Sequence, residues 1–141
     1  MTCPLVLDAN ALISLFDGSD DDLEQALCRT EVLVIPIVAY AEAMAGADSG
    51  TKRGTATLDA LARLLAKPNT RLLPVSEPTV RHYCMIFNLL KRNGTPIPTN
   101  DIWIAAATME CGGCLFTRDR HFLNVPMLDT LGLEGACPAV R

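Results

Sequence analysis

The stretch Pro4-Leu5-Val6-Leu7-Asp8-Ala9-Asn10 indicates the fold class, because a short and unbroken apolar run ends there at a carboxylate. Residues 4–7 are continuously apolar rather than alternating, which predicts a strand covered on both faces, as in a parallel sheet. Residues 32–35 and 114–117 have the same character, and longer helical patterns separate the three runs. This alternation predicts an α/β protein with a small central parallel sheet flanked by helices.

Turn and capping residues divide the rest of the chain into further elements. Ser19, ahead of three aspartates, is the expected N-cap of its helix, and Gly112-Gly113 is the expected end of another. Helices are expected over residues 10–16, 20–29, 37–46, 52–67, 77–93 and 99–111, and strands over residues 4–7, 32–35, 71–75, 114–117 and 126–128. With no repeat or linker between them, these elements predict one domain over residues 1–141.

Composition and charge exclude several classes of protein. The net charge of −4 argues against a protein that grips nucleic acid by bulk positive charge, although an acid-lined catalytic site would lower the balance by itself. The longest strongly apolar stretch, residues 32–41, is shorter than the roughly 20 residues that span a bilayer, so no membrane segment is expected. No signal peptide is evident before the six cysteines, which predicts reduced thiols and a cytoplasmic location.

Four acids lie in apolar surroundings and so need partners. Asp8 ends the first strand, Asp119 follows the strand at residues 114–117, Glu42 interrupts an apolar helix, and Asp101 opens the most apolar helix of the chain. Buried carboxylates cost several kcal/mol unless they are paired or metal-bound. Ligands of parallel sheets bind beyond the carboxyl ends of the strands, where these four can meet. A hard cation, Mg²⁺ or Mn²⁺, is the natural partner of such a cluster and suits phosphodiester hydrolysis.

Other residues leave alternatives open. Some of the acids could instead cap helices or pair with Arg118 or Arg120, and either arginine could contact RNA phosphate. Cys111-Gly112-Gly113-Cys114 has metal or redox spacing but no second pair of ligands, which favours a helix stop. A loop or structural role is favoured for His121 over that of a general base. An aspartyl-phosphate phosphatase or receiver domain would need a second Asp near Asp8 and a late lysine, and the sequence has neither.

Several segments, taken in order, resemble the PIN-domain ribonucleases and, within them, the VapC-type toxins of toxin–antitoxin pairs. The matching segments are Leu7-Asp8-Ala9-Asn10, Glu42 with Gly46, Asn100-Asp101-Ile102 with Ala105-Ala106-Ala107, and Thr117-Arg118-Asp119-Arg120-His121-Phe122 after Gly112-Gly113. The segments are individually common, but their order and spacing cover nearly the whole chain.

The resemblance implies a PIN-like fold and a Mg²⁺- or Mn²⁺-dependent endoribonuclease that acts as a toxin on an RNA substrate. It implies a catalytic set of Asp8, Glu42, Asp101 and Asp119, metal ligands Asp8, Asp101 and Asp119, and support from Asn10, Asn100 and Thr117. A cognate antitoxin that inserts a segment across the active-site groove, and a homodimer, are also implied. The alternative is a catalytically degenerate PIN-fold module that binds RNA or a protein without cutting.

Overall fold

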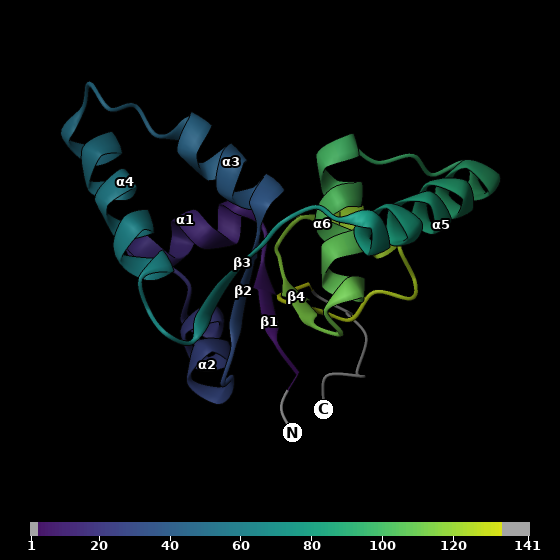
Figure 1. Ribbon diagram of the computed structural model, residues 1–141, viewed down its shortest axis with the longest axis horizontal. Coiled ribbons are helices and arrows are strands. Elements are labelled where there is room, and N and C mark those ends of the chain that lie inside the picture. Colours follow the sequence, from purple (N-terminus) through teal and green to yellow (C-terminus); the bar gives the residue numbers. More distant parts are fainter. Residues whose placement is uncertain (1–2, 134–141) are drawn as a thin grey trace.

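The computed structural model describes residues 3–133, a parallel sheet between two groups of helices (Figure 1). The elements in chain order are β1 (Leu5–Leu7), α1 (Ala9–Asp17), α2 (Asp21–Arg29), β2 (Leu33–Pro36), α3 (Ile37–Gly46), α4 (Lys52–Leu65), β3 (Thr70–Leu73), α5 (Glu77–Asn93), α6 (Thr99–Glu110), β4 (Cys114–Phe116), the 3₁₀ helix η1 (Arg120–Asn124) and β5 (Thr130–Leu131). The expected fold class, a small central parallel sheet flanked by helices, is confirmed.

The sheet has five parallel strands in the order β3-β2-β1-β4-β5. Strand β1 lies at its centre, with Leu5 in register with Leu33 of β2 and with Cys114 of β4. All three residues of β1 are buried, as the unbroken apolar run predicted. The carboxyl ends of β1 and β4 are therefore neighbours, and whatever follows the two strands is brought to one edge of the sheet.

The two faces of the sheet have separate apolar cores. Helices α1, α2 and α4 cover one face, where Leu12, Leu23 and Leu61 are buried together. Helices α5 and α6 cover the other face, with Ile86 and Ile102 in its core (Figure 1). Helix α3 contributes a small residue to each core, so it lies across the carboxyl edge between the two helical groups.

Several expected boundaries differ from the structure, most of them by one or two residues, and three differences have a clear local reason. Helix α1 begins at Ala9 rather than residue 10, because the Asp8 side chain caps it, and Asp20 rather than Ser19 caps α2. The last strand is β5 at residues 130–131, not residues 126–128. Leu128 is buried in a turn, where its backbone N–H donates to the Val125 carbonyl oxygen. The apolar character of this segment therefore indicated burial and not strand pairing.

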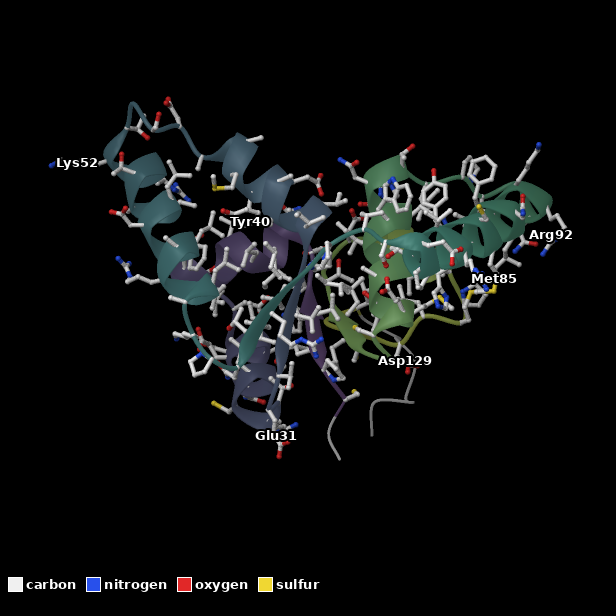
Figure 2. All side chains as sticks on the ribbon, in the orientation of Figure 1. Glu31, Tyr40, Lys52, Met85, Arg92 and Asp129 are labelled. Atoms are coloured by element: carbon white, nitrogen blue, oxygen red, sulfur yellow. The ribbon has the colours of Figure 1, made fainter. Side chains whose placement is uncertain are left out.

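Basic side chains lie at both ends of the long axis of the molecule. Lys52 begins α4 and Arg92 lies near the end of α5, at opposite extremities of the molecule (Figure 2). None of the helices within residues 3–133 combines the length and the apolarity needed to cross a membrane.

Gly54, in the first turn of α4, lies where the backbone of Asp48 passes the helix. A Cβ at this position would lie 1.6 Å from the Asp48 carbonyl oxygen, a backbone atom that cannot move without displacing the loop. Gly→Ala in a helix usually stabilises by up to about 1 kcal/mol. We expect Gly54→Ala instead to lower the free energy of unfolding by about 1–3 kcal/mol, as overpacking does, measured by urea denaturation.

Gly46→Ala is the matched control for this prediction. Gly46 is also helical, but an added Cβ would meet nothing within 4 Å. We expect this variant to be as stable as the wild type or slightly more so. Equal gains in stability for both variants would contradict the close approach at Gly54.

Candidate metal centre at the carboxyl edge of the sheet

The four predicted acids come to one edge of the sheet from four elements. Asp8 follows β1, Asp119 lies just beyond β4, Asp101 is in the first turn of α6, and Glu42 is on the exposed side of α3. Asp119 and Glu42 are close enough to Asp8 and to Asp101 for their charges to act on the pKa of both. The topology therefore gathers side chains that are up to 111 residues apart in the sequence.

Asp8 is the most buried of the four acids, with 5% of its surface exposed. Its Oδ1 accepts a hydrogen bond from the Ala11 backbone N–H at 2.8 Å, and its Oδ2 accepts one from the Thr117 hydroxyl. Burial raises the pKa of Asp8, although the hydrogen bonds from Thr117 and Ala11 oppose this, and the charges of Asp119 and Glu42 raise the pKa further. The carboxylate is thus fixed in place, but its charge is poorly compensated.

Thr117 connects the acids that follow the two central strands. It is fully buried, donates its hydroxyl proton to Asp8, and accepts a hydrogen bond from the Asp119 backbone N–H at 3.0 Å. Asp119 in turn caps η1, and the buried Phe122 anchors that helix in the core. The segment after β4 therefore has little freedom to move relative to Asp8.

Within the described residues 3–133, Asp101, Asp119 and His121 form a group of potential metal ligands. His121 Nδ1 lies 3.1 Å from Asp101 Oδ2 and 3.2 Å from Asp119 Oδ1. One ligand atom from each residue lies within 4.8 Å of the other two. Burial raises the pKa of Asp101, as does the charge of Asp119, while the contact with His121 lowers it. Two carboxylates and an imidazole in this arrangement fit a divalent cation.

His121, for which the sequence favoured a loop or structural role, lies in the short helix η1 with its side chain beside two of the predicted acids. The side chain is 51% exposed and faces both acids across the mouth of the site. It lies in η1, two residues after Asp119, and its own backbone N–H donates to Asp119 Oδ1 at 2.9 Å. The spacing Asp119-x-His121 was the available signal, since a short helix places both side chains on the side of Asp101.

A cavity of about 410 Å³ opens over this group of ligands. Its lining residues are Glu42, Pro98, Thr99, Asn100, Asp101, Asp119 and His121. Glu42 and Asn100 are exposed on its rim. Asp8 lies beneath and does not line the cavity, so Asp101 and Asp119 are the aspartates that a ligand entering from solvent meets first.

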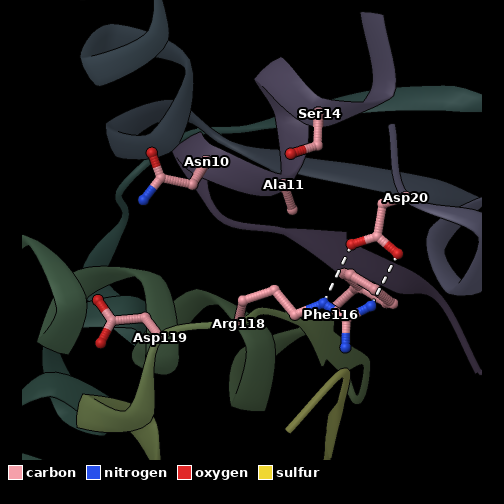
Figure 3. Close-up of a pocket in the computed structure, with 7 residues that line it drawn as sticks. All are labelled: Asn10, Ala11, Ser14, Asp20, Phe116, Arg118 and Asp119. Atoms are coloured by element: carbon pink, nitrogen blue, oxygen red, sulfur yellow. Dashed lines mark hydrogen bonds and ion pairs between the residues drawn. The ribbon is translucent and has the colours of Figure 1, made fainter. Parts of the chain in front are cut away.

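Asn10 and Arg118 lie on the other side of Asp119, around a second cavity of about 270 Å³ (Figure 3). This cavity is lined by Asn10, Ala11, Ser14, Asp20, Phe116, Arg118 and Asp119. Within residues 3–133, the Asn10 side chain makes no hydrogen bond to a carboxylate. Arg118 pairs with Asp20 at 2.8 Å and with Asp22 at 3.0 Å, and Arg120 is exposed.

The Cys111–Cys114 segment serves the fold, as the sequence favoured. Gly112 adopts a positive φ of 67° just after α6, and the Gly113 N–H donates to the Thr108 carbonyl at 3.0 Å. The Cys111 thiol donates to the same carbonyl at 3.5 Å. The segment ends the helix and turns the chain into β4.

The chain is thus an α/β protein whose parallel sheet brings several carboxylates together at its carboxyl edge, in a group that fits a divalent cation. Residues 5–128 match the PIN domain, and the chain belongs to the PIN-domain family. The resemblance identified from the acidic segments is thereby confirmed.

Several known proteins are similar to this chain over most of their own length. Ribonuclease VapC1 of Haemophilus influenzae strain R2866 is 28% identical over 117 residues, which cover 81% of this chain and 85% of that protein. The structure of VapBC-1 from nontypeable Haemophilus influenzae has a TM-score of 0.76 at 26% identity, covering 91% of this chain and 96% of that one. DNA-bound VapBC from Salmonella typhimurium has a TM-score of 0.77 at 20% identity, covering 92% and 98%, and shows the shared fold.

Proposed function

We propose that this protein is a metal-dependent endoribonuclease and the toxin of a toxin–antitoxin pair. The observation that carries the proposal is the group formed by Asp101, Asp119 and His121, with the buried Asp8 beneath it. The similarity to a protein named Ribonuclease VapC1 supports RNA as the substrate. An RNA substrate would place the activity in the cytoplasm.

The residues present fit one divalent cation at Asp101, Asp119 and His121. Such a cation, Mg²⁺ or Mn²⁺, supplies a polarised phosphoryl oxygen and an activated water when it is bound. Asp8, predicted from the sequence as a further ligand, stays a prediction in that role; it adds a negative charge below the site, and Thr117 and Ala11 hold its carboxylate in one orientation. Carboxylate oxygens suit both ions.

A protein partner follows from the same charges. Structures similar to this one are named as VapBC complexes, and we propose that a cognate antitoxin covers the acidic cavity of this chain. A basic side chain of that partner would compensate Glu42, Asp101 and Asp119, which line the cavity together. The homodimer and the single domain over residues 1–141 stay predictions.

A binding module without catalysis is the alternative, and the acids disfavour it. Burial raises the pKa of both Asp8 and Asp101, so in the absence of a cation their charges oppose folding. A protein that only bound RNA or a partner would gain stability by losing these charges.

The proposal is tested by incubating the purified protein with structured RNA. We expect cleavage in Mn²⁺ or Mg²⁺ and none after addition of a chelator, with recovery when the metal is restored. Cleavage that continues in the presence of chelator would show that the cation site is not the source of the activity, and binding without cleavage in any metal would favour the alternative.

A further inference from the structure

The guanidinium of Arg118 is held as a rigid plane beside the acidic site. Its Nε and Nη2 donate to the two carboxylate oxygens of Asp20 at 3.0 and 2.8 Å, Nη2 also donates to Asp22, and Nη1 donates to the Gly132 carbonyl at 2.7 Å. The central carbon lies 5.2 Å from the centre of the Phe116 ring. About half of the Arg118 side chain nevertheless stays exposed, toward the cavity shown in Figure 3.

The charges around this cavity do not suit a phosphate. Two carboxylates already pair with Arg118, and Asp20 and Asp119 both line the cavity. An anion placed there would have to displace an aspartate from the arginine and would meet the charge of Asp119. A neutral, planar ligand meets neither obstacle, because an arginine plane whose charge is already compensated can still stack on an aromatic ring.

The remaining lining residues can recognise the edge of such a ring. The side chains of Asn10 and Ser14 line the cavity from α1, and neither forms a hydrogen bond with another of the described residues. Ala11 supplies an apolar wall. An amide and a hydroxyl each offer both a donor and an acceptor, as the hydrogen-bonding edges of nucleobases require.

Asp119 places this cavity next to the proposed reaction site. It lines both cavities, one with Asp101 and His121 and the other with Arg118. We infer that the cavity at Arg118 is a subsite for one nucleobase of the RNA, adjacent to the bond that is cut, with the base stacked on the guanidinium. This inference rests on the proposed ribonuclease function, and it makes Arg118 a residue that determines specificity rather than one that binds phosphate.

The test combines variants of Arg118 with base removal from the substrate. A short oligoribonucleotide spanning one mapped cleavage site is prepared intact and with a single abasic nucleotide at each position on either side of the cut. For the wild type, we expect kcat/KM to fall by about 5- to 150-fold for one flanking position, the effect of one lost stacked base. In Arg118→Ala, removing that same base should have no further effect.

Two further variants keep the result interpretable. Arg118→Lys retains a positive charge for Asp20 and Asp22 but not the plane, so it should fold and also lose the response to the missing base. Arg29→Ala makes the same change at an exposed position at the far end of α2 and should keep the wild-type pattern. Thermal unfolding of each variant reports on folding.

Each outcome bears on a definite claim. A wild type that cuts no intact RNA contradicts the proposed function itself, before any abasic substrate is used. An equal abasic penalty in the wild type, Arg118→Ala and Arg118→Lys overturns the subsite while leaving the ribonuclease in place. A penalty unchanged in the variants, together with weaker binding of the antitoxin, would assign the cavity to the protein partner instead.

Discussion

Asp101→Asn is expected to reduce metal-dependent RNA cleavage by at least about a hundredfold. Loss of a residue that merely supports a ligand commonly costs 10- to 100-fold in affinity or activity, and loss of the ligand itself costs more. Asp101 faces both His121 at 3.1 Å and the charge of Asp119, and it lines the cavity that the substrate would enter. The measurement is the initial rate of cleavage at saturating Mn²⁺.

The same variant should fold well, which separates a lost ligand from a lost structure. Burial raises the pKa of Asp101, so the neutral amide of nearly the same shape removes a charge that is unfavourable in the metal-free protein. We therefore expect Asp101→Asn to unfold at a slightly higher temperature than the metal-free wild type. A gain in stability accompanied by a loss of activity is typical of a functional site.

Asp59→Asn is the matched control, because it makes the same change of charge at an exposed position on α4. It should leave both the cleavage rate and the unfolding temperature near their wild-type values. Wild-type cleavage by Asp101→Asn would remove Asp101 from the metal centre. An equal loss of activity in Asp59→Asn would point to net charge instead of a ligand.

The sequence predicted those features that depend on local apolar pattern. The central strand β1 and the buried helix α6 were visible because their apolar runs have the length and continuity of covered elements. The acids were visible because Asp8 and Asp101 interrupt apolar surroundings. Because the carboxyl ends of parallel strands meet at one edge of a sheet, these acids were expected together at that edge.

The features that were missed depend on contacts between distant segments. The spacing of Asp119 and His121 in the sequence indicates that these two lie close together, but the approach of His121 to Asp101, 20 residues earlier, depends on the fold. Likewise, nothing in the sequence connects Arg118 to Asp20, 98 residues away.

The burial of an apolar helix face also depends on the fold. The apolar residues Val80 and Phe87 of α5 are 41% and 45% exposed, although their helical spacing resembles that of a core face.

The stability of the metal-free protein should fall as the pH rises above about 4. Burial raises the pKa of Asp8 and of Asp101 above the usual 3.8, so the folded state holds protons that the unfolded chain has already released. The stabilisation from these bound protons is complete below the pKa that the two acids have in the unfolded chain. It is lost as the pH rises through their higher pKa in the folded protein. Asp20, whose pKa the hydrogen bond from Arg118 lowers, acts in the opposite direction, but only in the window below 3.8.

A divalent cation should reverse this trend, because it binds the deprotonated carboxylates and competes with protons. At a free concentration of a hundred times its Kd, Mn²⁺ would add about 2.7 kcal/mol to the free energy of unfolding. The measurement is a series of urea denaturations between about pH 4 and 8, with chelator or with Mn²⁺.

In Asp101→Asn we expect a shallower pH dependence and a smaller gain from Mn²⁺, whereas Asp59→Asn should follow the wild type. Metal-free stability that rises across this range, or an equal gain from Mn²⁺ in all three proteins, would contradict a cation site built on Asp101. The buried acids thus oppose folding in the metal-free protein, and the cation that compensates them would connect the stability of the fold to the activity of the site.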